Sequence, residues 1–395
     1  MEFRGAEPTR RHHRQPTGGV VSGAQGLAAL SASLARALAD KHADSNLVFS
    51  PLSIYTALAL VAAGARGATL DEILRFLGAP SRGELDAFVA RAAGAALQDQ
   101  SGSGGPCVAF ACGVWSDMAC PLKPGFRRAV VDGPYGAEAS TVDFRGDPEG
   151  SRQLINAWAA RATNGLIESV LGRNSVNELT RVVLGNAVYF KGKWDQPFHK
   201  SDTADAPFRR AGGAGAVDVP FMQSWKRQFV AVHAGFKVLK LKYKMGDARP
   251  RPPLHPRDDA STPGFLHEHL PTQKVGVGEF RVPRFKLSFH DSVGGVLNKL
   301  GLRMPFSEAA DLSDMTDLPL VLSEVIHKAV TEVNEEGRRA AAVTMCLMKE
   351  GCEARPRPPP PVDFVADHPF AYFIVEEGTG AVCLCRPCPR SLDTI

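Results

Sequence analysis

The side chains best suited to chemistry in this 395-residue chain are a group of cysteines near its end and a histidine pair. Cys383, Cys385 and Cys388 are spaced like half of a metal site, but no second Cys or His pair lies at the spacing of a zinc finger. His267 and His269 flank a glutamate without forming the His-Glu-x-x-His motif of zinc proteases. The sequence therefore predicts no metal and no cofactor.

Motifs of covalent and phosphate chemistry are also absent from the sequence. It contains no Gly-x-Ser-x-Gly nucleophile elbow and no Walker-type phosphate loop. Ser, His and Asp are scattered along the chain, and such residues indicate a catalytic triad only when geometry brings them together. We therefore expect that the protein is not an enzyme.

Charge and cysteine content limit the expected partners and compartment. Lys and Arg exceed Asp and Glu by 46 to 42, a small excess that looks spread along the chain, so we expect neither a nucleic-acid nor a membrane partner. The eight cysteines do not form a dense disulfide framework, and no Asn-x-Ser/Thr sequon occurs. We expect a cytoplasmic or nucleocytoplasmic protein.

Residues 1–24 are expected to form a disordered basic tail. Arg4, Arg10 and Arg14 lie among Pro and Gly, without the apolar run of about 7 to 15 residues that a secretory signal needs. Nuclear targeting or nucleic-acid contact is the alternative interpretation, but short basic runs are weak evidence for either.

Hydrophobic periodicity divides the chain into a helical first half and a strand-rich second half. Leu27, Leu30 and Leu34 recur as on one face of a helix, and Ser50 and Pro51 are suited to cap and begin the next one. Alternating residues later in the chain predict strands with one buried face. The sequence predicts an α+β fold, with helices at 53–64, 69–77, 81–98 and 151–163 and strands at 181–190, 236–243 and 278–289.

Seven short blocks carry the strongest signal in the sequence. They are Asn46–Ile54, Gly64–Thr69, Ile155–Trp158 with Thr163–Ile167, Leu184–Trp194, Val219–Met222, Ile326–Ala329 with Val333–Gly337, and Asp363–Phe370. Taken in this order, the blocks resemble the serpin family over about Leu27 to Cys385. The sequence of the last block, Asp363–Phe370, most resembles that of the plant cytosolic branch, the serpin-Z-like proteins.

This resemblance implies the fold and a mechanism. The expected fold is one domain over 25–395 with three β-sheets, eight or nine helices and an exposed reactive-centre loop at about 337–362. In an inhibitory serpin, a protease cleaves this loop and stays attached as an acyl-enzyme while the loop inserts into the main sheet as a new strand. Inhibition is then a race between insertion and hydrolysis of the acyl bond.

The hinge at the start of this loop departs from the family pattern. Inhibitory serpins have small or uncharged residues there, such as Gly-Thr-Glu followed by alanines, whereas this chain has two arginines before its alanines. Because side chains on a strand alternate, Arg338, Ala340 and Ala342 would share one face. The resemblance to serpins implies that this face turns into the core, with Arg338 entering first. The hinge residues are Glu335, Glu336, Gly337, Arg338, Arg339, Ala340, Ala341, Ala342, Val343 and Thr344.

The site of protease cleavage is expected to lie about 14 to 15 residues after Gly337, by the count the family uses. That count places the scissile bond near Gly351–Cys352, and glycine has no side chain to fill a specificity pocket. Lys349, two residues earlier, is the nearest basic residue that a trypsin-like protease could accept.

Two further departures concern sheet B of the family fold. Where serpins carry an apolar strand, residues 245–263 are rich in proline, which cannot donate to a strand ladder. In the last strand, Arg386 stands where the family has a small buried glycine, and Pro387 and Pro389 follow it. We expect parts of sheet B to be shortened or damaged.

The expected function is that of a serpin which has lost efficient inhibition. Two alternatives stay open: a working suicide inhibitor of a serine or cysteine endopeptidase, favoured by Ala340 to Thr344, and a degenerate gene product that folds poorly. We expect a monomer, and the resemblance also allows an extracellular location.

Overall fold

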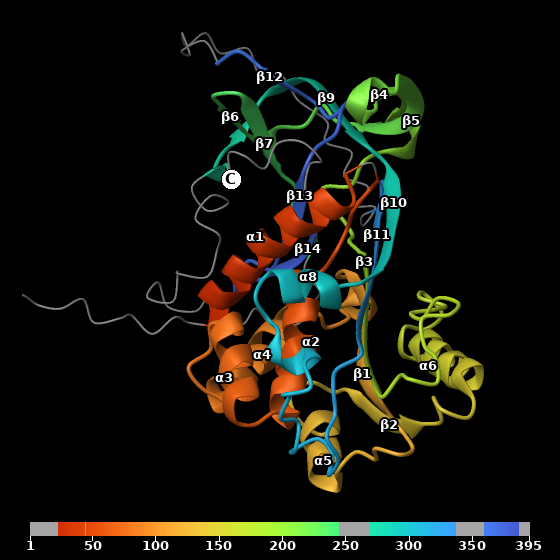
Figure 1. Cartoon of the computed structure of the whole chain (residues 1–395). Helices are drawn as coiled ribbons and strands as arrows, with labels where there is room; N and C mark the ends of the chain where they lie inside the picture. The colour runs from red at the N-terminus through yellow and green to blue at the C-terminus, as the bar shows by residue number, and fades with distance from the viewer. Residues whose placement is uncertain (1–22, 44, 245–268, 337–358, 387–395) are drawn as a thin grey trace, which may run out of the picture.

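Four helices near the start of the chain pack against one face of a large sheet (Figure 1). The structure is a computed structural model that describes residues 23–43, 45–244, 269–336 and 359–386. The helices are α1 (Gly23–Lys41), α2 (Pro51–Gly64), α3 (Gly67–Leu77) and α4 (Arg82–Ala96). Short 3-10 helices lie at Ser101–Ser103, Lys200–Asp202, Ala211–Gly213 and Met304–Phe306.

Helix α2 lies in the middle of this layer, with almost every side chain buried. It begins as the sequence predicts, because Ser50 Oγ accepts a hydrogen bond from the Ser53 amide at 3.2 Å and Pro51 is the first helical residue. Its contacts with α1, α3, α4 and the large sheet make it the centre of the main hydrophobic core.

The large sheet has five strands in the order β10-β11-β3-β1-β2. Neighbouring strands are antiparallel except for the pairs β11–β3 and β1–β2, which are parallel. The strands are β1 (Cys107–Asp117), β2 (Glu138–Val142), β3 (Val182–Lys191), β10 (Phe285–Ser292) and β11 (Glu324–Val333).

Helix α6 (Pro148–Ala162) covers the opposite face of this sheet (Figure 1). Its buried residues Ile155 and Ala159 pack with Trp115, Val183 and Ile326 of three different strands. Two further helices, α5 (Pro124–Val131) and α8 (Gly294–Lys299), bring the number of α-helices in the described residues to seven. The middle of the large sheet is therefore enclosed on both faces.

A second sheet of four strands takes the order β12-β9-β5-β4. It consists of β4 (Thr203–Arg209), β5 (Ala216–Gln223), β9 (Val277–Pro283) and β12 (Val362–Val365). The predicted single strand at 278–289 is wrong, because the chain leaves this sheet after Pro283 and enters the large sheet at Phe285. At the crossing, the Arg284 amide donates to Pro220 O at 2.8 Å.

The remaining strands form two separate small sheets instead of one. They are β6 (Gln228–His233), β7 (Phe236–Lys240) and β8 (Lys274–Val275) in one sheet, and β13 (Tyr372–Val375) and β14 (Val382–Arg386) in the other. The described residues thus contain four sheets where the resemblance implies three. The proline-rich segment 245–263 lies outside the described residues, and β7 and β13 are edge strands within them.

The last strand forms despite the unfavourable residues in it. The backbone of β14 pairs with β13 as far as Arg386, and Phe49 pairs with Cys385 on its other side. Pro387 and Pro389 lie outside the described residues. The α+β prediction is confirmed, and no helix in the described parts of the chain is both long and apolar enough to cross a membrane.

Candidate functional site

The centre of the large sheet is a seam between two parallel strands, β3 and β11. Residues Val183 to Lys191 pair with Glu324 to Glu332, so the seam extends over nearly the full length of both strands. Parallel pairing is slightly less stable per residue than antiparallel pairing. A strand that turned back from the end of β11 and entered this seam would be antiparallel to both neighbours.

A buried polar network connects the two seam strands near the middle of their length. His327 Nδ1 lies 2.6 Å from Asn186 Oδ1, which also accepts from Ser53 Oγ at 2.9 Å. The Ser50 amide donates to His327 Nε2 at 3.0 Å, so the imidazole is neutral with its hydrogen on Nδ1. Burial lowers the pKa of His327 to about 3. The network therefore joins both seam strands to the start of α2 without burying a charge.

An ion-pair cluster joins the two strands at the upper end of the seam. Lys191 Nζ lies 3.1 Å from Glu332 Oε1 and 3.2 Å from Glu336 Oε2. Burial opposes the charge on Lys191, but hydrogen bonds to the two glutamates raise its pKa overall. Tyr189 OH also donates to Glu332. The end of β3 is thus tied to β11 and to the residues that follow it.

Trp194 fixes the backbone immediately after β11. Its indole Nε1 donates to Asn334 O at 2.6 Å, and its amide donates to Glu336 O at 3.0 Å. The Glu336 amide donates in turn to Asn334 Oδ1 at 3.0 Å. Trp194 itself is buried and stacked on Tyr243. Residues 334–336 therefore form a fixed turn.

Glu335 is the most deeply buried carboxylate of this turn, with only 4% of its surface exposed. Thr203 Oγ1 donates to its Oε1 at 3.0 Å, and Arg284 Nη1 lies 3.5 Å from the same oxygen. Thr203 begins β4 of the second sheet, and Arg284 marks the crossing between the two sheets. Glu335 thus links the end of β11 to the second sheet.

Comparison with known proteins identifies this architecture. Residues 25–385 match the family model described as "Serpin (serine protease inhibitor)". The chain belongs to the serpin family. It is 51% identical to the putative serpin-Z8 of Oryza sativa subsp. japonica over 95% of this chain and 96% of that protein. It is 41% identical to serpin-ZX of Hordeum vulgare over 87% of this chain and 89% of that protein.

Solved serpin structures share the fold. Arabidopsis AtSerpin1 in its "native stressed conformation" superposes with a TM-score of 0.80 at 34% identity, covering 92% of this chain and 98% of that one. Uncleaved ovalbumin gives a TM-score of 0.72 at 23% identity, covering 93% of this chain and 99% of that one, and shows the likeness of fold alone. The predicted resemblance to plant serpins of the Z type is confirmed.

The structure describes only part of the predicted serpin hinge. Glu335 and Glu336 lie in the fixed turn above the seam. The other hinge residues, Gly337 to Thr344, and the candidate cleavage residues Lys349, Gly351 and Cys352 lie outside the described residues. The far end of the predicted loop returns at Val362, whose amide donates to Gly276 O at 2.9 Å beside the second sheet.

Several residues of this site were not among the functional residues predicted from the sequence. Asn186, Lys191, Trp194 and His327 lie within blocks that resemble the family, and this likeness was their only signal. Thr203 and Arg284 contact the hinge from positions far away in the chain and lie outside these blocks, so no local pattern could have revealed their role.

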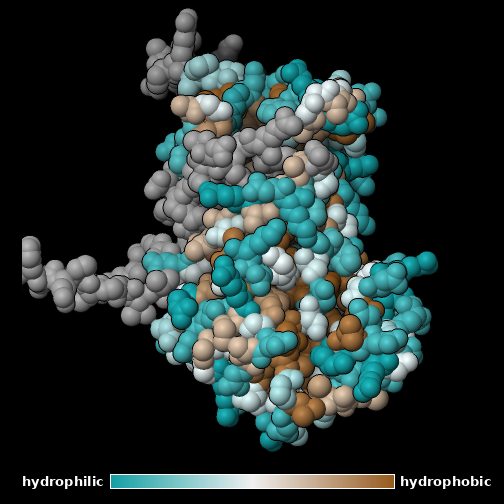
Figure 2. Space-filling model, viewed as in Figure 1, coloured by the Kyte–Doolittle hydropathy of each residue, from teal (hydrophilic) through white to brown (hydrophobic). Residues whose placement is uncertain are grey.

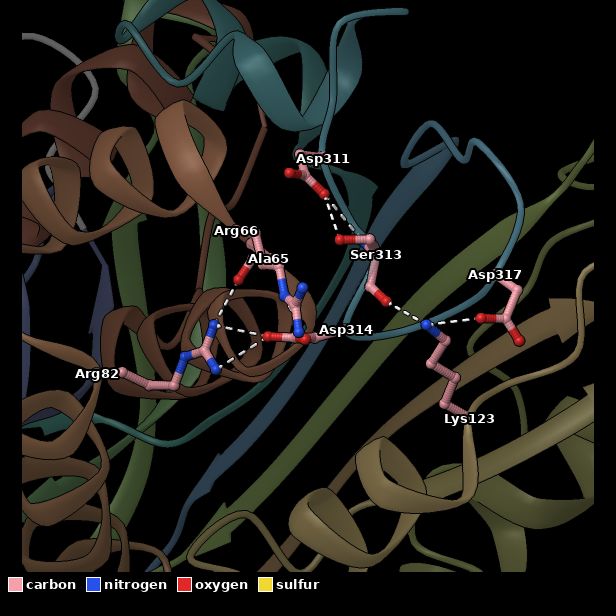
Figure 3. Close-up of polar contacts among 8 residues, drawn as sticks. All are labelled: Ala65, Arg66, Arg82, Lys123, Asp311, Ser313, Asp314 and Asp317. Atoms are coloured by element: carbon pink, nitrogen blue, oxygen red, sulfur yellow. Dashed lines mark hydrogen bonds and ion pairs between the residues drawn. The ribbon is translucent and has the colours of Figure 1, made fainter.

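The segment 311–317, which precedes β11 in the chain, is attached to the helical layer by polar contacts (Figure 3). Arg82 donates to Asp314 Oδ2 through two guanidinium nitrogens at 3.2 and 3.3 Å, and Arg66 Nε lies 2.6 Å from Asp314 Oδ1. Lys123 pairs with Asp317 and donates to Ser313 O, both at 2.7 Å. These contacts fix the connection that leads toward β11.

Proposed function

We propose that this serpin is a poor protease inhibitor, and that a protease which cleaves its loop treats it as a substrate. The observation that supports the proposal is the fixed turn at 334–336. Because Trp194, Thr203 and Arg284 already hold these residues, a loop that entered the seam would start with Gly337 and Arg338.

The geometry of this turn sets which side chains would face the core. If the loop turned back over residues 334–337, Arg338 would lie opposite Val333, and directly opposite residues of an antiparallel pair share one face. Val333 is buried, and its neighbours on the same face, Thr331 and Ala329, are fully enclosed. Arg338 would therefore enter the seam on its most enclosed side, followed by Ala340 and Ala342.

The surroundings of the upper seam do not suit a guanidinium group. Phe190 and Thr331 are partners across the seam, and the Phe190 ring packs edge-on against Tyr243 at 5.2 Å. Burying an unpaired charged group costs several kcal/mol. An increase of about 3 to 4 kcal/mol in the insertion barrier slows insertion by roughly a hundred to a thousandfold. Hydrolysis of the acyl bond then becomes faster than insertion.

Efficient inhibition is the second candidate function, with a serine or cysteine endopeptidase as the partner. It is supported by the closed five-stranded sheet and by the small residues Ala340 to Thr344. A solved relative with the same fold is described as native and stressed, which is the state from which insertion starts. In this case the Arg338 guanidinium would stay in solvent while its methylene groups pack against the sheet.

Poor folding is the third candidate. It is supported by the separation of β7–β6–β8 from β13–β14, which leaves two edge strands within the described residues. Against it stands the large core that α2 forms with the main sheet.

Incubation with trypsin, a papain-like protease and an elastase-like protease tests the proposal. We expect loop cleavage without a complex that survives SDS, and no increase in melting temperature after cleavage. The matched variant Arg338→Thr with Arg339→Glu should produce an SDS-stable complex with at least one of these proteases. An SDS-stable complex formed by the unmodified chain would overturn the proposal and establish the second candidate.

We further propose that the protein acts as a monomer in the cytoplasm or nucleus. Cys107, Cys112, Cys120, Cys383 and Cys385 are free thiols, which suits a reducing compartment. Four of them are buried, and burial raises the pKa of Cys112 and of Cys383 to about 12, so these thiols are protected from oxidation.

A further inference from the structure

A local excess of positive charge lies in the segment of this serpin that contains β6 and β7. Six basic residues and no acidic residue lie between Val219 and Lys244. The expectation that charge is spread evenly is therefore wrong for this segment. The six residues are Lys226, Arg227, Lys237, Lys240, Lys242 and Lys244.

Strand pairing places Lys240 and Lys274 on one face of the β7–β6–β8 sheet, whereas Lys237 lies on the other. Lys274 of β8, Phe229 of β6 and Lys240 of β7 are direct partners in one row across the sheet. Directly paired residues point to the same face. On the opposite face, Val230 is buried and Leu239 packs against a hydrophobic core, and the exposed Val232 pairs there with Lys237. Part of the opposite face thus packs on the protein, while the first face presents Lys274 and Lys240 on either side of Phe229.

Phe229 lies beside two lysines, one of which, Lys242, is close enough to Glu377 to help lower the pKa of that carboxyl. Lys242 Nζ lies 5.5 Å from the centroid of the Phe229 ring, and Lys274 Nζ lies 5.3 Å from it. Among the described residues neither lysine has an acidic partner within ion-pair distance. Lys240 pairs with Glu377 at 2.7 Å and is therefore neutralised. Arg227 adds a further cation beside them by donating to Lys274 O at 2.7 Å.

Aromatic rings occupy the other end of the same face. His233 and Phe236 are direct partners, and their rings stack at 4.9 Å with an interplanar angle of 23°. His269 packs against both rings, at 4.8 Å from His233 and 5.5 Å from Phe236. Phe236 is 38% exposed. Phe236 and Lys240 are four positions apart on β7, which corresponds to about 13 Å along the strand.

We propose that this face, consisting of Lys242, Lys274, Arg227, Phe229, His233 and Phe236, binds single-stranded nucleic acid. Cations that follow the phosphates and aromatic rings on which bases stack are the two components of such sites. A sulfated polysaccharide or an acidic peptide would use the cations but has no planar base for the Phe236 ring. Duplex nucleic acid keeps its bases stacked on one another, so it too would use the cations alone.

This inference is independent of loop insertion. The proposed surface lies on the β7–β6–β8 sheet, whereas the hinge lies at the top of the β3–β11 seam. Binding is therefore expected whether or not the protein inhibits a protease.

Fluorescence anisotropy with the full chain tests the proposal. The probes are labelled oligo-dT and oligo-U of about 12 nucleotides, the matching duplex and a labelled heparin fragment, at about 50 and about 200 mM salt. We expect the single strands to bind more tightly than the duplex, and the affinity to fall steeply with salt.

Two variants and a matched control separate the components. Lys242→Gln with Lys274→Gln should weaken single-strand binding about tenfold at low salt and reduce its salt dependence. Phe236→Ala should weaken it about tenfold while leaving heparin binding unchanged. Arg91→Glu with Lys299→Glu, which alters two exposed cations of α4 and α8, should leave binding unchanged.

Three results would each overturn the proposal. They are no binding to single strands at low salt, equal binding to all four probes with no effect of Phe236→Ala, and full binding by the double lysine variant. Thermal melting of each variant confirms that it is folded, and Phe236 and Lys242 are exposed enough for their replacement to leave the core intact.

Discussion

His327 and Asn186 face each other across the central seam, with His327 Nδ1 2.6 Å from Asn186 Oδ1. Each side chain comes from a different strand of the parallel pair, and both reach α2 through Ser50 and Ser53. One buried network therefore joins the two strands that loop insertion would have to separate.

Replacing His327 by Ala should destabilise the protein, because it leaves the Ser50 amide without its partner in the core and removes one of the hydrogen bonds to Asn186 Oδ1. We expect the free energy of unfolding to fall by about 2 to 4 kcal/mol. Urea unfolding followed by tryptophan fluorescence measures this. Because the network closes the seam, the variant should also accept an added loop peptide faster than the parent chain, and an unchanged rate would show that the network does not limit opening.

Stability should decrease as the pH falls below about 6.5. An unfolded histidine binds a proton near pH 6.5, whereas burial keeps His327 neutral in the folded protein down to a pKa of about 3. Between these values the unfolded state binds more protons, so acid favours unfolding. Melting temperatures between pH 7 and about 5 should show this fall, in a range above the titration of most carboxylates.

His290 supplies the comparison for the pH experiment. Burial also lowers the pKa of His290, although its hydrogen bond to Val170 O opposes the shift. His327→Gln should flatten the pH dependence more than His290→Gln does. If the two variants flatten it equally, the deep burial of His327 is not the main source of the acid sensitivity.

Removing the cation of Lys191 should weaken the upper end of the seam. Lys191→Met eliminates the ion pairs with Glu332 and Glu336 and should cost about 1 kcal/mol or less, since this cluster is partly solvated. High salt should reduce the difference between parent and variant in urea unfolding. Lys200→Met, an exposed change, serves as the control and should show no effect at either salt concentration.

Two aspartates of the segment 311–317 should differ in their contribution to stability (Figure 3). Asp314→Asn breaks the contacts with Arg82 and Arg66 and should lower the free energy of unfolding by about 1 to 2 kcal/mol. Asp317, whose side chain is 85% exposed, pairs with Lys123 in solvent, and Asp317→Asn should change stability by less than about 0.5 kcal/mol. Equal losses for the two variants would contradict this assignment.

Local features of the fold could be predicted from the sequence, and long-range ones could not. Ser50 and Pro51 start α2 as expected, since a cap and a first-turn proline act within one helical turn. The run from 278 to 289 looked like one strand because alternation does not reveal that a chain changes sheets at Arg284.

Prediction from the sequence was limited to local features at the hinge as well. Its sequence could be compared with the serpin pattern, and this comparison led to Arg338. The residues that fix its start, Thr203, Arg284 and Trp194, come from other parts of the chain and meet only in the folded protein. The cationic face of β7–β6–β8 was missed for a different reason, because the small net charge of the whole chain concealed a local excess.

The parallel seam also affects the order in which strands can pair while the chain is being synthesised. Strands β1 to β3 are complete by Lys191, but their partner β11 begins only at Glu324. While the chain is being synthesised, β3 therefore presents an unpaired edge until more than a hundred further residues have been added. Such an edge can pair with another chain. This serpin should therefore be most prone to aggregate during its synthesis, before β11 has been added to the chain.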